Sequence, residues 1–225
     1  MASQRTVKAV LLDGMGTLIR LVPPAPALAA GLGVDAETAA RAFRAEVDYY
    51  VAHHLEGGDP AGLARLRRGC AEVVAEVAHT DVDAAHDALM GALRFEAFAD
   101  APGALRALRE RGLRLVVASN WDWSLTAVLE RIGLLPLLDG AVASAVVGAA
   151  KPDGRIFTAA LELAGCSPAE ALHVGDSLEA DYEGATATGV EAVLLDRGAT
   201  AAASPDGPRA IRSLAELAPL LSSHA

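Results

Sequence analysis

Short apolar runs alternate with helix-length stretches through the second half of this 225-residue chain. The runs have the length of buried strands, and the stretches between them have the length of helices. The predicted elements are a helix from Pro102 to Gly112, a strand from Leu113 to Ala118, a helix from Ser124 to Ile132, a short strand near Ala141 to Ala143, a helix from Arg155 to Ala164, a strand from Ala171 to Val174, a helix from Glu179 to Thr188 and a strand from Glu191 to Leu195. This alternation predicts an α/β fold with an open sheet.

The N-terminal region supplies one more strand. Residues Val7 to Leu12 form an apolar run of strand length that ends at Asp13, as expected for a central parallel strand covered on both faces. Because ligands bind beyond the carboxyl ends of such strands, Asp13 is expected to face a crevice.

The region after this strand has a different pattern. The segment Pro23-Pro24-Ala25-Pro26 is expected to break regular structure, and three helical stretches follow without a strand signal. These stretches run roughly from Ala36 to Leu55, from Pro60 to Ala78 and from Val82 to Leu93. We therefore expect a core of residues 1–18 and 98–225, interrupted by a helical insert of residues 19–97.

Composition excludes several classes of partner. The net charge is -10 and the basic residues are scattered, so nucleic acid is not expected as a partner.

The N-terminus has no secretory signal, and Pro136 and Asp139 interrupt the longest apolar stretch, so we expect a cytoplasmic protein without a membrane span. Cys70 and Cys166 are expected to be buried and reduced, and Ala199 to Pro208 to be a low-complexity loop.

Residues that suit phosphate chemistry follow the predicted strands or lie on the loops between them. These positions are Asp13, Ser119, Asn120, Lys151, Asp176 and Asp181. Because the carboxyl ends of parallel strands lie along one edge of a sheet, the side chains are expected to converge there. Each has a structural alternative, since Ser119-Asn120 and Asp176 also suit helix caps and Lys151 also suits a solvated surface.

Together, these segments resemble those of the haloacid dehalogenase-like (HAD) superfamily of hydrolases. The resemblance lies in Asp13-Gly14-Met15-Gly16-Thr17-Leu18, Ser119-Asn120, Lys151-Pro152 and Gly175-Asp176-Ser177-Leu178-Glu179-Ala180-Asp181, which occur in the family's order. It implies a Rossmann-like parallel sheet with helices on both faces, and an all-helical cap domain inserted after the first strand. The active site would lie between the core and the cap.

The resemblance also implies roles for individual residues. Asp13 would attack phosphorus, Ser119 and Lys151 would bind the transferring group, and Gly14, Thr17 and Asn120 would complete the substrate-binding site. Mg²⁺ would be held by Asp13, Asp176, Asp181 and the backbone carbonyl of Met15. The expected reaction is hydrolysis of a small phosphorylated metabolite through an aspartyl-phosphate, by a monomer or a homodimer.

One position departs from the family's phosphatase pattern. Phosphatases that resemble this chain carry an aspartate two positions after the nucleophile, and Met15 stands there. A thioether exchanges no protons, so esters with poor leaving groups are expected to react slowly. Two alternatives stay open: a dehalogenase that expels halide from a haloacid, and a catalytically impaired protein that binds a ligand or partner.

Further residues are candidates for specificity. His53, His54, Arg65, Arg67 and Arg68 lie in the predicted insert and either face the core or form a solvated helix surface. One of the two tryptophans, Trp121 or Trp123, is expected to line the crevice while the other packs in the core. His173 is expected to be a hydrogen-bonded core histidine.

Overall fold

The computed structural model describes residues 6–198 and 208–222. Its main sheet has six strands in the order β5-β4-β1-β6-β7-β8, and all neighbouring strands are parallel. The strands are β1 (Ala9–Leu12), β4 (Arg114–Ser119), β5 (Gly140–Ala143), β6 (Ala171–Gly175), β7 (Glu191–Leu195) and β8 (Ala210–Ile211). The α/β fold with a parallel sheet is therefore confirmed.

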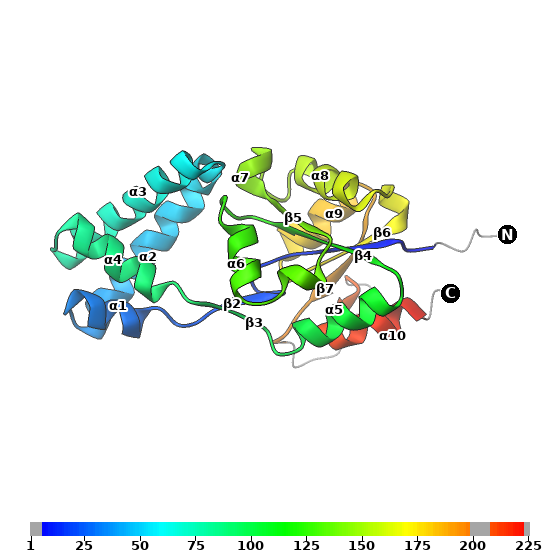
Figure 1. Ribbon diagram of the computed structural model, residues 1–225, viewed down its shortest axis with the longest axis horizontal. Coiled ribbons are helices and arrows are strands. Elements are labelled where there is room, and N and C mark those ends of the chain that lie inside the picture. Colours follow the sequence, from blue (N-terminus) through cyan, green and yellow to red (C-terminus); the bar gives the residue numbers. More distant parts are fainter. Residues whose placement is uncertain (1–5, 199–207, 223–225) are drawn as a thin grey trace.

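Helices cover both faces of this sheet (Figure 1). Side chains of β1 alternate between the two faces, with Val10 and Leu12 in one apolar core and Ala9 and Leu11 in the other. The first core is covered by α5 (Ala101–Glu110), α6 (Leu125–Arg131) and α10 (Leu217–Ser222), and the second by α8 (Gly154–Ala164) and α9 (Gly184–Ala187). A short helix, α7 (Ser144–Val147), follows β5.

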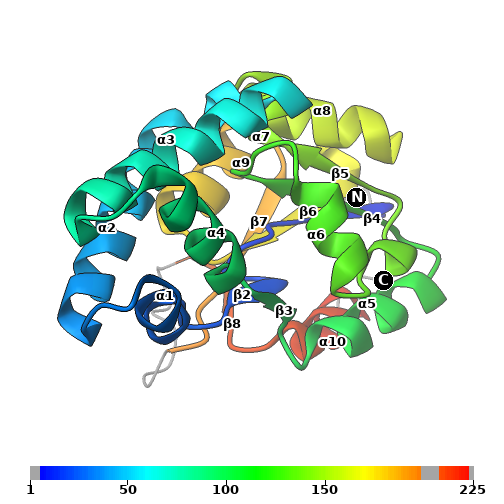
Figure 2. The same ribbon diagram turned by 60° about the vertical axis from the view of Figure 1, so that its left-hand side comes forward.

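A separate group of helices, α1 to α4, follows the first strand and lies to one side of the sheet (Figures 1 and 2). These helices are α1 (Ala25–Leu32), α2 (Ala36–His53), α3 (Pro60–Ala78) and α4 (Val82–Ala92). They pack around an apolar cluster of their own that includes Leu28, Val74 and Leu89. An antiparallel pair of short strands, β2 (Ile19–Leu21) and β3 (Phe95–Ala97), connects the group to the core.

Several predicted details were wrong. The first strand begins at Ala9 because Lys8 is exposed and pairs with Glu170. The proline-rich segment does not break regular structure, since α1 begins at Ala25 and accommodates Pro26 in its first turn, where a helix needs no amide donor. The strands β2 and β3 were missed, because three residues are too few to show an alternating pattern.

Other details concern single segments. The predicted helix from Glu179 is a π-helical turn, Leu178–Glu183, followed by the short α9. Cys70 is buried, whereas Cys166 is only half-buried because it lies at the end of α8. Residues 199–207 of the predicted low-complexity loop lie outside the described residues.

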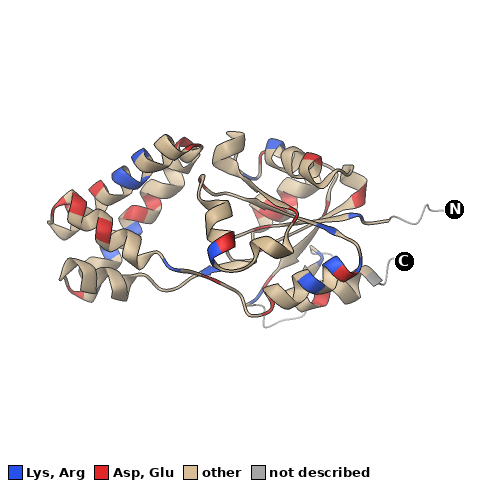
Figure 3. Ribbon diagram, in the orientation of Figure 1, with Lys and Arg blue, Asp and Glu red and all other residues tan. Residues whose placement is uncertain are grey.

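The distribution of charge and hydropathy can be followed along the described residues. Lys and Arg positions are distributed over both the sheet region and the helix group, without a continuous basic stripe (Figure 3). Within residues 6–198 and 208–222, no helix is both long and apolar enough to cross a bilayer.

Candidate active site

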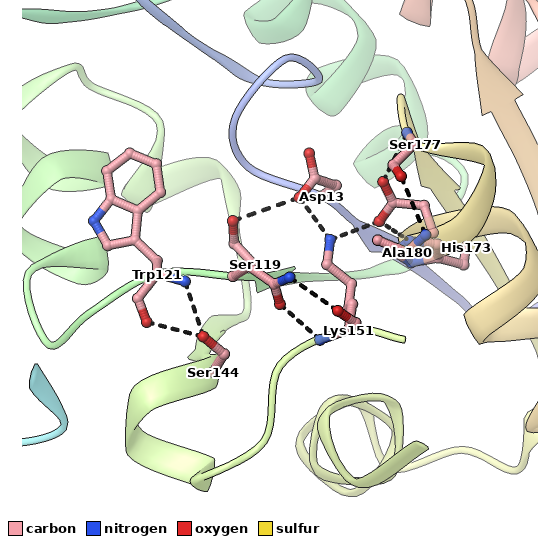
Figure 4. A network of polar contacts seen from close by, with 10 residues as sticks. Asp13, Ser119, Trp121, Ser144, Lys151, His173, Ser177 and Ala180 are labelled. Carbon is pink, nitrogen blue, oxygen red and sulfur yellow. Dashed lines mark hydrogen bonds and ion pairs between the residues drawn. The ribbon is translucent and has the colours of Figure 1, made fainter. Parts of the chain in front are cut away.

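Three adjacent strands, β4, β1 and β6, deliver polar residues to the same edge of the sheet. Leu12, the last residue of β1, lies beside Val117 and Val174 in the ladder. Asp13 follows Leu12 directly, and its backbone amide donates to the Val174 carbonyl over 2.9 Å. Ser119 ends β4, so the parallel register brings its side chain toward Asp13 (Figure 4).

Lys151 provides the positive charge of this edge. Its Nζ lies 2.6 Å from Asp13 Oδ1 and 2.6 Å from Asp181 Oδ1, and its side chain is 2% exposed. Asn120 fixes the loop that carries it, because the Asn120 amide accepts from the Lys151 N–H over 2.7 Å and donates to the Lys151 carbonyl over 3.1 Å. The structure therefore brings together Asp13, Lys151 and Asp181 as one buried ion cluster.

Asp181 is held on both of its carboxylate oxygens. Its Oδ1 receives Lys151 and also lies 2.9 Å from His173 Nε2, while its Oδ2 accepts from the Ser177 N–H over 3.0 Å. An ionised carboxylate only accepts, so the Nε2 atom of His173 donates. His173 is fully buried, with its ring edge against Phe157, as expected for a core histidine.

Two opposing influences set the pKa values of Asp13, Lys151 and Asp181: burial disfavours the charged form, and the neighbouring opposite charges favour it. Burial raises the pKa of Asp13 to about 6, although the charge of Lys151 opposes this shift. Burial also disfavours ionised Asp181, but the His173 hydrogen bond and the Lys151 charge outweigh it, so the pKa of Asp181 is lowered. For Lys151, burial is outweighed by the charges of Asp13 and Asp181, and its pKa is raised. The cluster is therefore most stable with Lys151 and Asp181 charged.

The same edge offers oxygen ligands for a divalent cation. Asp13, Asp176 and Asp181 each provide a carboxylate oxygen, and these oxygens lie within 4.8 Å of one another. Asp13 Oδ2 is buried and has no hydrogen-bond partner among the described residues. A Cβ at Gly16 would lie 1.9 Å from Asp176 Oδ2, so the loop leaves room for this carboxylate only because residue 16 is glycine. The donor set suits Mg²⁺.

The loop after β1, residues 13–18, also approaches Ser119 closely. A Cβ at Gly14 would lie 2.7 Å from Ser119 Oγ, so a larger residue there would displace this hydroxyl. Ser119 Oγ is 3.5 Å from Asp13 Oδ1, a long contact that leaves the hydroxyl able to turn toward a ligand. The buried Thr17 hydroxyl has no partner among the described residues. The Ser119 and Thr17 hydroxyls therefore belong to the same edge of the sheet as Asp13, one at the end of β4 and the other in the loop after β1.

Arg197 supports the loop that carries Asp13, and the sequence interpretation missed it. It lies just after β7, and its guanidinium donates to the carbonyls of Gly16 over 3.3 Å and Thr17 over 2.8 Å. It also forms two 3.0 Å hydrogen bonds with Asp100 and stacks on Phe98 at 4.0 Å. Arg197 thus fastens the loop after β1 to the core, and its position after a predicted strand end was the signal that could have identified it.

A cavity of about 500 Å³ lies beside this cluster, between the helix group and the core. Met15 and Asn120 line it, and each is close in sequence to a member of the site. Trp121 lines the cavity, as expected of one of the two tryptophans. The expectation that the other packs in the core was wrong, because Trp123 is 47% exposed. Successive residues of a loop differ in direction, and Trp123 points outward.

Most of the helix-group residues that were expected to select the substrate do not line this cavity. Of the five predicted histidines and arginines, only Arg67 lines it. Arg68 instead pairs with Asp83 and Glu72 on the surface. From the helix group, the polar side chains that line the cavity and were missed are Glu46, Tyr50 and Cys70. From the core, Asp122, Ser124 and Arg131 line it and were also missed.

Comparison with known proteins gives the class. The model of the haloacid dehalogenase-like hydrolase family matches residues 7–189, and the chain belongs to this family. It is 45% identical over 95 residues to the bovine haloacid dehalogenase-like hydrolase domain-containing protein 3, covering 42% of this chain and 38% of that protein. It is 37% identical over 112 residues to the ribulose-1,5-bisphosphate 5-phosphatase of Halopiger xanaduensis, covering 49% of this chain and 47% of that protein. The matched regions thus span less than half the length of these curated relatives.

Solved structures show the same fold. The L-2-haloacid dehalogenase from Xanthobacter autotrophicus superposes with a TM-score of 0.74 at 20% identity, covering 98% of this chain and 100% of that one. The HAD phosphatase from Thermococcus onnurineus gives a TM-score of 0.67 at 24% identity, covering 96% of this chain and 98% of that one. At these identities the likeness concerns the fold alone.

Proposed function

We propose that this protein is a Mg²⁺-dependent phosphatase of small phosphorylated molecules that works through an aspartyl-phosphate on Asp13. The observation that carries the proposal is the Lys151 ammonium, 2.6 Å from both Asp13 and Asp181 on the edge where the other oxygen ligands converge. Phosphoryl transfer brings an anionic nucleophile to an anionic substrate, so positive charge at this point is what catalysis requires.

The chain's residues suggest the following reaction. Asp13 Oδ2, the oxygen without a hydrogen-bond partner among the described residues, attacks phosphorus while the ester P–O bond breaks and the electron pair leaves with the alcohol oxygen. Water then attacks the aspartyl-phosphate, which releases inorganic phosphate and restores the Asp13 carboxylate. Lys151 compensates charge in both steps, and Ser119 and Thr17 offer hydroxyl donors to the phosphoryl oxygens.

The donor set tells which residues would hold the metal. Asp181 accepts hydrogen bonds from Lys151, His173 and Ser177, whereas no other described residue donates to the Asp176 carboxylate. Asp13 Oδ1 accepts from Lys151 and, at 3.5 Å, from Ser119, so it keeps capacity for a metal while Oδ2 attacks. We therefore propose Asp13, Asp176 and the Met15 carbonyl as direct ligands, with Asp181 supporting Lys151 and the metal. Bound Mg²⁺ would add positive charge beside the transferring phosphoryl group.

The replacement of an acid by Met15 shapes the expected substrate range. Met15 is 37% exposed, lines the cavity and has no proton to give to a leaving alkoxide. Acyl and nitrophenyl phosphates need no such proton because their leaving groups are weak bases. The enzyme is thus expected to hydrolyse them faster than alkyl phosphates.

The position of the helix group suggests the domain arrangement. We propose that residues 19–97 form a cap over a core made of residues 1–18 and 98–225, with the substrate enclosed between them. The cavity of about 500 Å³ is in the size range of small-molecule sites, which favours a metabolite over a macromolecule.

Dehalogenation is the second candidate, favoured by the apolar Met15 beside the nucleophile. In that reaction Asp13 would attack carbon and expel halide. A haloacid carries a carboxylate, however, and it would approach three acidic side chains that lie within 4.8 Å of one another. A halide-release assay on a haloacid separates the two chemistries.

The test is phosphate release from nitrophenyl phosphate and acetyl phosphate, with Mg²⁺ or with a chelator. We expect Mg²⁺-dependent release by the wild type and a loss of at least roughly 10³-fold in Asp13→Asn, because the nucleophile is removed. The control is Asp48→Asn, which removes an exposed carboxylate from α2. Equal activity of Asp13→Asn and wild type would contradict the proposal, and tight ligand binding without release would indicate a binding protein.

A further inference from the structure

Glu46 is a buried carboxyl group that the proposed reaction does not use. It lies on α2, is 5% exposed and lines the cavity between the helix group and the core. Among the described residues its only hydrogen-bond partner is the thiol of Cys70, a weak donor, and it forms no ion pair with any of them. Buried carboxylates are normally paired, so this one requires an explanation.

The neighbours of Glu46 do not compensate its charge. Tyr50, one turn further along α2, donates to Asp122 Oδ2 over 3.1 Å, and Asp122 Oδ1 accepts from the Ser124 N–H over 2.7 Å. Asp122 is therefore satisfied within the protein, whereas Glu46 is not. Burial raises the pKa of Tyr50 and of Cys70, and the charge of Glu46 adds to both shifts, so these groups share one desolvated acidic region.

Two arginines line the same cavity but leave Glu46 unpaired. Arg67 is half-buried and Arg131 is exposed, and neither forms an ion pair with Glu46. Positions of both signs are distributed over the helix group, so the overall charge of this region does not select a ligand (Figure 3). The local carboxyl group is therefore the feature that distinguishes the cavity.

The cavity lies where the rest of a substrate would extend. Met15 and Asn120 line it, and they neighbour Asp13 and Ser119 in the chain. A group bound to phosphorus at Asp13 would therefore continue into this space. Its other walls include Phe43, Leu66 and Phe95, which suit an apolar or aromatic body.

We propose that Glu46 selects phosphate esters whose leaving group has an apolar body and ends in a primary ammonium. The inference rests on the proposed phosphatase function and names its substrate class. The ammonium would donate to the Glu46 carboxylate and give it the ion-pair partner that neither arginine of the cavity provides, while the apolar walls would bury the carbon skeleton. A charge-assisted hydrogen bond of this kind corresponds to a preference of about 10- to 100-fold.

The experiment compares three aryl phosphates that differ only at the para position: aminoethyl, ethyl and carboxyethyl. Their phenols are similar leaving groups, so the ratio of kcat/KM reports recognition rather than chemistry. The variant is Glu46→Gln, which keeps the size of the side chain, and Asp48→Asn on the same helix is the control. We expect the wild type and Asp48→Asn to prefer the aminoethyl ester about 10- to 100-fold over the ethyl ester, and Glu46→Gln to lose this preference.

A binding measurement separates this inference from the proposed function. In a Trp123→Phe background, Trp121 is the single tryptophan and lines the cavity, so its fluorescence reports occupancy. Phenethylamine is expected to bind more tightly than phenethyl alcohol, by about tenfold or more, and the difference is expected to vanish in Glu46→Gln.

The outcomes are distinguishable. Phosphate release with no preference for the ammonium, or with a preference for the carboxyethyl ester, would overturn the role of Glu46 and leave the phosphatase function standing. Glu46-dependent binding of phenethylamine without phosphate release from any ester would support recognition of the amine and overturn the phosphatase function. The absence of both the preference and the binding would overturn the inference.

Discussion

Lys151 and Glu46 are both buried ionisable side chains, and the protein treats them in opposite ways. Lys151 lies at the sheet edge with a carboxylate on each side, both 2.6 Å away. Glu46 lies on α2, and the thiol of Cys70 is its only hydrogen-bond partner within the part of the chain that the structure describes. The sheet edge thus compensates its own charge, while the cavity contains a charge that nothing in the described protein neutralises.

The difference has a structural origin. Parallel strands gather residues from distant parts of the chain at one edge, so acidic and basic groups can be paired there. The cavity wall combines one face of α2 and α3 with a core loop, and apolar side chains dominate it. The paired charges at the sheet edge suit a reaction that is common to a family. The unpaired carboxyl group of the cavity suits the recognition of a particular ligand.

Removal of Lys151 should have the largest effect on stability. Lys151→Met leaves Asp13 and Asp181 buried without their cation, so we expect a loss of about 3–5 kcal/mol in the free energy of unfolding in chelator. Mg²⁺ should restore part of it, because the metal would neutralise the same carboxylates. Denaturant unfolding with and without Mg²⁺ measures both effects.

The chain offers a matched control for this variant. Lys8 is the only other lysine, and it forms an exposed pair with Glu170. Lys8→Met should leave stability unchanged within error. A Lys151→Met protein as stable as Lys8→Met would show that the cluster is not the compensated unit described above.

Replacement of Glu46 should change the free energy of unfolding by less than the Lys151 variant does, and it should stabilise the protein rather than destabilise it. Burial raises the pKa of Glu46 from its usual 4.5 to about 7, so the folded state holds a proton that the unfolded state has released. Stability of the wild type therefore falls as the pH rises from about 4.5 to about 7, and it levels off above that range. Glu46→Gln removes this dependence.

The measurement is the difference in unfolding free energy between Glu46→Gln and wild type at about pH 5 and about pH 8. The variant should gain roughly 2–3 kcal/mol relative to the wild type between these values. Cys70, Tyr50 and Asp122 surround Glu46 and are unchanged in the variant. A difference that does not depend on pH would mean that Glu46 has a partner that compensates its charge.

The smallest expected effect concerns Met15, which lies where the two regions meet. Met15→Asp places a proton donor beside the leaving group, so turnover of alkyl phosphates should rise about tenfold, below the usual 10²- to 10⁴-fold value of a fully positioned acid. Acetyl phosphate should change less, since its leaving group needs no proton. Met15→Asn is the control of similar size, and an equal effect on both substrates would contradict the assignment.

Much of the fold could be predicted because it depends on local patterns. The helix from Pro60 to Ala78 was predicted with the bounds that the structure has, and five strands of the parallel sheet were found within one or two residues. The two-residue strand β8 at its edge was missed, because it is too short to show a pattern. The convergence of Asp13, Ser119 and Lys151 followed from a general rule about parallel sheets. That rule needs only the strand ends, which apolar runs mark clearly.

Side-chain partnerships could not be predicted in this way. The sequence interpretation placed Asp181 among the metal ligands, and whether it binds metal stays a prediction, but its hydrogen bonds to Lys151 and His173 depend on a π-helical turn. Arg197 contacts the loop after β1 although 181 positions separate it from Gly16 in the chain. Neither set of contacts can be predicted from the periodicity of apolar residues in the sequence.

The sequence by itself determined the parallel sheet, the family resemblance and the set of charged residues at the sheet edge, because strand length and strand ends are local properties. Only the tertiary structure decided which charges are paired. Glu46 is one of many glutamates on amphipathic helices, and it becomes exceptional only when α3 and the loop after β4 enclose it. Burial of a charge depends on what packs against it, and that information lies in distant parts of the chain.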